Sequence, residues 1–80
     1  MEITYSIPTP FKMIINVDNK KMVLTGEGTT TPAFYADIKS MKNWEPPYEN
    51  EKITELEKQE IIKVIEQMSQ KQGEIPIYFE

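Results

Sequence analysis

Hydrophobic and polar residues alternate with a period of two over most of the first half of the chain. Residues 2–7 and 11–17 follow this pattern, and residues 21–25 resume it after the turn-forming residues 18–20. A period of two is typical of half-buried β-strands, so the second and third stretches predict a hairpin. Alternation returns over residues 33–41 and predicts a fourth strand.

Prolines and glycines mark the breaks between these stretches. Pro8 and Pro10 follow the first strand, and because proline cannot donate to a sheet ladder we expect the strand to stop there. Residues 26–32 predict a flexible loop. Their two glycines could cradle a phosphate, but neither a helix start nor a P-loop lysine follows them.

One helix is predicted to begin near Thr54, because Thr54 and Glu57 have the spacing of a capping box. An apolar stripe within about 160° of arc should face the sheet; it comprises Ile61, Ile62, Val64, Ile65 and Met68. Gly73 is the expected C-cap. Residues 74–80 alternate again, and Pro76 places this last strand at an edge of the sheet.

The element order is therefore β-β-β-β-α-β. It predicts an α+β fold in which an antiparallel sheet of about four to five strands carries one helix on one face. With 80 residues, the chain is expected to form a single domain over 1–80 with one modest core.

Composition excludes several chemistries. The chain contains no histidine, cysteine or arginine, so it lacks the commonest general base and metal ligand, and it has no thiol nucleophile. The carboxylates are scattered, and no calcium-loop spacing occurs. We therefore expect no enzymatic activity, no metal site and no cofactor. Short apolar runs and the lack of a secretory signal predict a cytoplasmic protein that does not bind membranes.

The net charge of −4 is concentrated in one segment. Residues 45–60 contain six glutamates and two lysines. Such a segment repels nucleic acid and attracts a basic protein. Alternatively, these glutamates only form a solvated helix start, where they suit the positive end of the helix dipole. Lysines in the strand half protect sheet edges, and we expect no nucleic-acid partner.

The segment KNWEPPYENE, residues 42–51, joins the fourth strand to the helix. Its two prolines stiffen the chain. Trp44 at such a corner is expected to fill the end of the core with its indole N–H bonded to a carbonyl. Alternatively, Trp44 or Tyr48 is an exposed aromatic anchor ringed by glutamates, as in protein interfaces. The candidate partner-binding residues are Trp44, Glu45, Tyr48, Glu49, Glu51 and Glu55.

Three motifs carry a family resemblance. They are the K-x-W-E-P-P corner at 42–47, the E-K-Q-E-I-I-x-x-I helix at 57–65, and a final strand ending at 78–80. This order resembles the immunity protein 74 family, small bacterial proteins predicted from gene neighbourhoods to neutralise toxins of polymorphic toxin systems. The resemblance is clearest over 33–80, whereas residues 1–32 offer only a hairpin in a compatible place. It implies toxin binding without catalysis or a cofactor.

Two hypotheses of function follow. The first is a non-enzymatic immunity protein that binds a cognate toxin, encoded nearby, through the acidic surface of residues 45–60. The alternative is a structural or regulatory interaction module that forms a homodimer through the exposed edge strand of residues 74–80.

Overall fold

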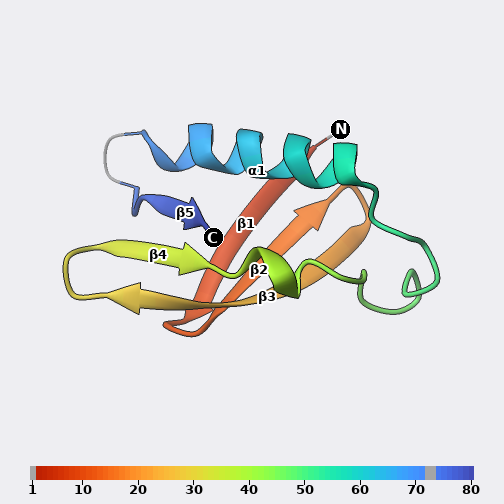
Figure 1. The fold of residues 1–80 in the computed structure, drawn as a ribbon, viewed down its shortest axis with the longest axis horizontal. Helices are drawn as coiled ribbons and strands as arrows, with labels where there is room; N and C mark the ends of the chain where they lie inside the picture. The colour runs from red at the N-terminus through yellow and green to blue at the C-terminus, as the bar shows by residue number, and fades with distance from the viewer. Residues whose placement is uncertain (1, 72–73) are drawn as a thin grey trace.

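A five-stranded sheet and one α-helix make up the fold (Figure 1). The computed structural model describes residues 2–71 and 74–80. The strands are β1 (Ile3–Thr9), β2 (Lys12–Val17), β3 (Lys20–Thr29), β4 (Ala33–Ala36) and β5 (Ile77–Phe79), the α-helix is α1 (Glu55–Ser69), and a short 3-10 helix, η1, spans Ile38–Ser40. The predicted α+β fold and the order β-β-β-β-α-β are confirmed.

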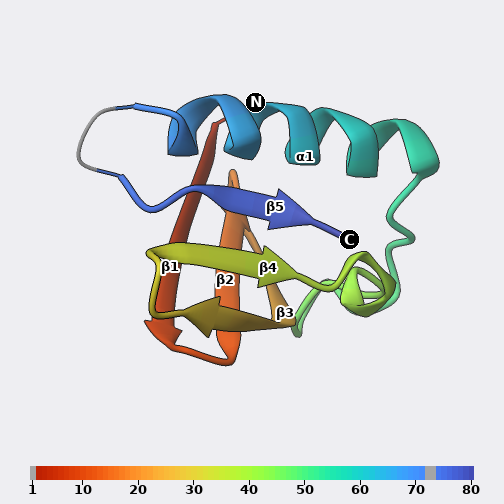
Figure 2. The same ribbon diagram turned by 60° about the vertical axis from the view of Figure 1, so that its left-hand side comes forward.

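The strands lie in the sheet in chain order, β1-β2-β3-β4-β5. The first three pairings are antiparallel, while β4 and β5 are parallel. Parallel strands need a long crossover, and here the chain from η1 through α1 provides it. Figure 2 shows β3, β4 and β5 in front of β1 and β2, with α1 above them. The sheet is thus mostly antiparallel, with one exception at its β5 edge.

Strand β3 joins the two halves of the sheet. Its first half pairs with β2 and its second half with β4. The loop predicted over residues 26–32 is therefore wrong in its first part, because β3 continues to Thr29. Gly26 allows this: a Cβ there would lie 2.5 Å from the Phe34 ring and 2.6 Å from the Tyr35 carbonyl oxygen. The glycine marks a close approach inside the sheet, not a flexible turn.

Two other predicted boundaries also shift. β1 runs through Pro8 to Thr9, with a register irregularity between Ser6 and Thr9. Proline is tolerated there because β1 is an edge strand. The fourth strand ends at Ala36, since the Asp37 side chain accepts a hydrogen bond from the Lys39 amide (3.0 Å) and starts η1.

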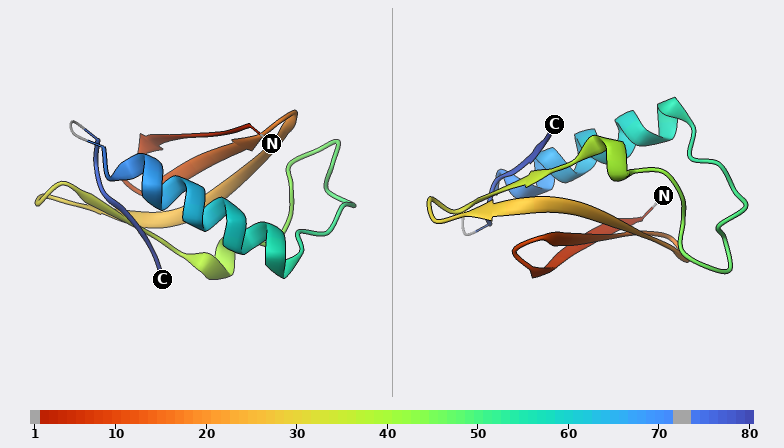
Figure 3. Two further views of the ribbon diagram at one scale, coloured as in Figure 1. Left: turned by 90° about the horizontal axis from the view of Figure 1, so that it is seen from above. Right: turned by 60° about the horizontal axis from the view of Figure 1, so that its bottom comes forward.

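The core lies between the sheet and α1, which crosses one side of the sheet (Figure 3). The buried apolar residues are Ile3, Met13, Ile15, Val17, Met22, Leu24, Phe34, Ala36, Met41, Trp44, Ile61, Ile65 and Ile77. They come from every strand and from α1. Of the predicted helical stripe, Ile61 and Ile65 are buried, Ile62 and Val64 pack half-buried against the core, and Met68 is half-buried. The capping box of Thr54 and Glu57 is present. The expected C-cap, Gly73, lies outside the described residues.

The last turn of α1 is tied to β5 through Ser69, which is buried. The Ser69 hydroxyl donates to the Glu66 carbonyl (3.0 Å) and accepts from the Ile77 amide (3.2 Å). In the parallel ladder, the neighbouring carbonyl of Pro76 accepts from the Phe34 amide (2.9 Å). The Ile77 amide faces away from β4, so α1 occupies a hydrogen-bonding position on the open edge of β5.

Candidate partner-binding surface

The segment after η1 forms a closed loop, residues 43–52, here called the corner loop. Asn43 and Lys52 form an isolated β-bridge that joins its ends. The Glu45 amide donates to the carbonyl of Lys21 in β3 (2.7 Å), and the Tyr48 amide donates to the Glu45 carbonyl (3.0 Å). These bonds give the loop a defined shape and fix it to the free side of β3.

Trp44 anchors the corner loop from inside. Its side chain is 2% exposed and belongs to the hydrophobic core. The expected core role is therefore confirmed. The predicted hydrogen bond of the indole is not: its Nε1 is buried and has no partner among residues 2–71 and 74–80. Trp44 therefore supports the corner loop from the core and lies beneath the residues that a partner could touch.

Lys20, in β3, lies against the corner loop. Its Nζ is 2.8 Å from Glu51 Oε1, 5.5 Å from the Trp44 ring centroid and 5.8 Å from the Tyr48 ring centroid. Both distances are within the range of cation–π attraction. The hydrogen bond to Glu51 raises the pKa of Lys20 above its ordinary value. Sequence reasoning missed Lys20 because only the fold brings it to a residue 31 positions away.

The carboxylates of the acidic segment fall into three groups. Glu51 is paired with Lys20. Glu55 and Glu57 occupy the first turn of α1, where they suit the helix dipole. Glu45, Glu49 and Glu60 are exposed, and no ion pair or side-chain hydrogen bond joins them to any residue the structure describes; Glu60 lies further along α1, away from the corner loop. The solvated helix start thus accounts for part of the segment, and Glu45 and Glu49 remain available to a partner.

Leu56 is a residue that the sequence did not single out. It lies in the first turn of α1, between Glu55 and Glu57, and its side chain is 81% exposed. An uncovered apolar side chain with charged neighbours is typical of a protein interface. The sequence could have predicted this exposure, because Leu56 precedes Ile61, the first residue of the apolar stripe on α1.

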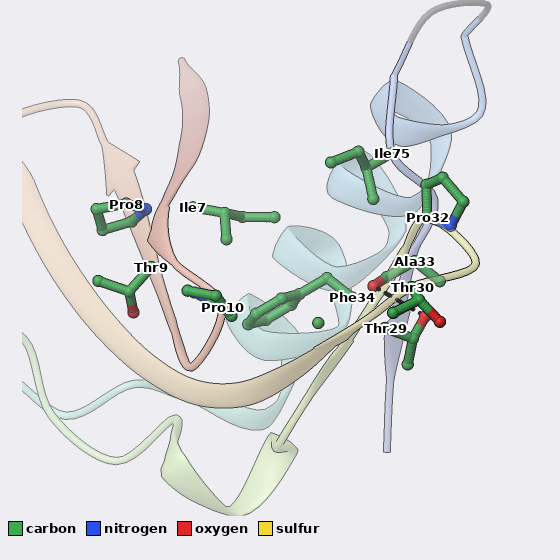
Figure 4. Close-up of a pocket in the computed structure, with 11 residues that line it drawn as sticks. Ile7, Pro8, Thr9, Pro10, Thr29, Thr30, Pro32, Ala33, Phe34 and Ile75 are labelled. Atoms are coloured by element: carbon green, nitrogen blue, oxygen red, sulfur yellow. Dashed lines mark hydrogen bonds between the residues drawn. The ribbon is translucent and has the colours of Figure 1, made fainter.

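A second feature is an apolar groove of about 460 Å³ between the end of β1 and the turn that joins β3 to β4. Figure 4 shows Ile7 and Phe34 projecting into one space, with Ile75 on its far side. None of the described residues that line it is charged. Among these described lining residues, only threonines carry hydroxyls, so they can hold apolar groups but offer no acid or base.

Within residues 2–71 and 74–80, no three acidic side chains are grouped so that they could hold a metal ion. No helix in the described part of the chain is long and apolar enough to cross a membrane.

Fold and surface together define a small α+β domain that exposes carboxylates and a few apolar side chains. A family model described as immunity protein 74 matches residues 7–80, and the chain belongs to this family. Immunity proteins have toxins as their partners. The match includes residues 7–32, most of the region where the sequence resemblance was weakest. Comparisons with curated proteins and with solved structures gave no significant match.

Proposed function

We propose that the protein neutralises a cognate toxin in the bacterial cytoplasm by binding it, without catalysis and without a cofactor. Membership of the immunity protein 74 family is the observation that carries this proposal. The toxin would be the product of a neighbouring gene. Binding alone suffices for neutralisation if the complex covers the toxin's active site or prevents its assembly.

The corner loop and the first turn of α1 are the proposed contact surface. They present Glu45, Tyr48, Glu49, Glu51 and Glu55, with Leu56 beside them. Negative charge of this density raises the rate of association with a basic protein and orients that protein as it approaches. Leu56 supplies the apolar centre that charged residues alone do not give an interface.

The fixed shape of the loop supports this role. The Asn43–Lys52 bridge, the bond from the Glu45 amide to β3, and buried Trp44 all hold the loop in place before any partner arrives. A surface that is already ordered loses less conformational entropy on binding, and affinity rises accordingly.

Reversing the charge of Glu45 and Glu49 tests the surface with the least disturbance of the fold. Glu51 is unsuitable because its loss would leave Lys20 without its ion pair, and Glu55 is unsuitable because it suits the helix start. We expect Glu45→Lys with Glu49→Lys to weaken toxin binding by about tenfold, mainly through slower association.

A matched control separates local charge from net charge. Adding Lys63→Glu and Lys71→Glu, at exposed positions, restores the net charge away from the corner loop. The variant with all four substitutions should still bind the toxin weakly. If it regains full affinity, or if the double variant binds normally, the corner loop is not the interface. Leu56→Ser should also weaken binding while leaving the unfolding midpoint unchanged, because that side chain is exposed.

Self-association through the last strand is the second candidate. β5 is an edge strand, which favours pairing with another chain. The bond from the Ile77 amide to Ser69 opposes it, since that amide is no longer free to pair. A monomer in sedimentation at high concentration excludes this candidate, whereas a concentration-dependent dimer that β5 substitutions abolish establishes it.

A further inference from the structure

The face of β3, β4 and β5 that points away from α1 carries two exposed tyrosines. Glu27 pairs with Tyr35, and Tyr35 pairs with Tyr78, so the three form one row across the strands. The alternate residues Phe34 and Ile77 are buried in the core. Because side chains alternate along a strand, the row lies on the opposite, helix-free face, which is turned forward in Figure 2.

The two tyrosines form a stacked pair. Their ring centroids are 5.4 Å apart and the planes meet at 23°. Tyr35 is 37% exposed and Tyr78 is 48% exposed. A rigid aromatic pair on an open sheet face is typical of interface anchors, because large rings bury much area and lose little conformational entropy.

A hollow of about 320 Å³ lies beside Tyr35. Of the described residues that line it, three carry carboxylates and none carries a positive charge; the three are Glu27, Asp37 and Glu80. Lys12 pairs with Thr25, which lines the hollow, and so borders this area on the β2 side.

The backbone fixes two of these carboxylate residues in place. The Glu80 amide donates to the Ala36 carbonyl (2.9 Å), and the Glu80 carbonyl accepts from the Ile38 amide (2.8 Å). The Asp37 amide donates to the Thr25 carbonyl (2.9 Å). The hollow therefore combines an aromatic wall with acidic side chains whose main-chain positions are set by the sheet.

We propose that this face, here called the tyrosine face and comprising Glu27, Tyr35, Asp37, Tyr78 and Glu80, docks a basic segment of a protein partner. An arginine side chain of that segment lies in the hollow. Its guanidinium stacks on the Tyr35 ring and donates hydrogen bonds to the carboxylates. Charge complementarity selects this occupant, because nucleic acid would be repelled by the same groups.

The tyrosine face lies on different elements from the corner loop, and its test needs no toxin. The probe is a hexapeptide of alternating arginine and glycine, titrated into ¹⁵N-labelled protein at low salt. We expect the largest amide shift changes at Glu27, Tyr35 and Tyr78, and weaker changes elsewhere. Changes confined to residues 45–60, or spread evenly over the acidic surface, overturn the proposal.

Four variants and one control peptide sharpen the result. Tyr35→Leu and Tyr78→Leu remove the aromatic rings and should weaken peptide binding by about three- to tenfold. Tyr35→Phe and Tyr78→Phe keep the rings and should bind as the unaltered chain does. A peptide with citrulline in place of arginine, which is neutral, should not bind. Full affinity in both leucine variants, or binding of the citrulline peptide, contradicts the inference.

Discussion

The Ser69 hydroxyl, at the end of α1, accepts a hydrogen bond of 3.2 Å from the Ile77 amide at the start of β5. This one side chain satisfies a buried main-chain donor and joins the helix to the edge of the sheet. The bond adds a second attachment for β5, which has only three residues and a single neighbouring strand.

Ser69→Ala should therefore lower the free energy of unfolding by about 1–3 kcal/mol, the cost of leaving a buried donor without a partner. Urea unfolding followed by circular dichroism measures it. Ser6→Ala, at an exposed strand position, is the matched control and should change stability by less than about 0.5 kcal/mol. Equal effects of the two substitutions would show that the Ser69 bond contributes nothing.

Gly26→Ala should destabilise the protein by about 1–3 kcal/mol, because the new methyl group would overlap the Phe34 ring. Gly28 lies two residues further along β3, where an added Cβ would be 3.5 Å from the nearest atom, an ordinary contact. Gly28→Ala should be close to neutral in the same unfolding experiment. Similar losses at both positions would mean that strand propensity, and not the Phe34 contact, sets the cost.

Two substitutions of Trp44 distinguish a core role of this side chain from an interface role. Trp44→Ala should cost about 3–5 kcal/mol, as expected for a large buried aromatic. Trp44→Phe keeps most of the packing and removes the buried N–H that lacks a partner in the described chain, so it should cost less than about 1.5 kcal/mol. Denaturant midpoints of the two variants test this, and a small loss in Trp44→Ala would place the side chain outside the core.

Stability should fall in alkaline solution for two identifiable reasons. Glu51 raises the pKa of Lys20 above 10.5, and burial, followed by the charge of Glu74, raises the pKa of Tyr5 above 10.0. In both cases the folded chain holds the proton more tightly, so the stabilisation is complete below the ordinary pKa and disappears as pH rises through the folded value.

Unfolding midpoints at pH 8 and pH 11 for Lys20→Met, Tyr5→Phe and the unaltered chain measure these contributions. The unaltered chain should lose more stability between the two pH values than either variant does. A parallel decline in all three proteins would show that neither group is linked to folding.

Local patterns predicted the local elements well. The Thr54 capping box and the buried positions of α1 follow from residues three or four apart, and the structure has both. The continuation of β3 through Gly26 could not be predicted in this way. It depends on Phe34, which lies on the neighbouring strand and reaches Gly26 only after the sheet has formed.

In the candidate surface, too, local features could be predicted from the sequence and tertiary contacts could not. The exposure of Glu45 and Glu49 could be predicted from charge and from the two prolines that lie between them. The pairing of Lys20 with Glu51 could not, because the two residues meet only through the docking of the corner loop on β3. Tyr35 and Tyr78 are likewise brought together by the parallel β4–β5 register, which an alternating pattern does not specify.

The most direct test of the central claim is a titration of the toxin domain encoded beside this gene with the purified chain, following toxin activity and complex formation together. The account predicts that activity falls linearly to zero as an equimolar complex forms, with no change in the chain itself. Undiminished toxin activity in the presence of excess chain, with no complex detected, would contradict it.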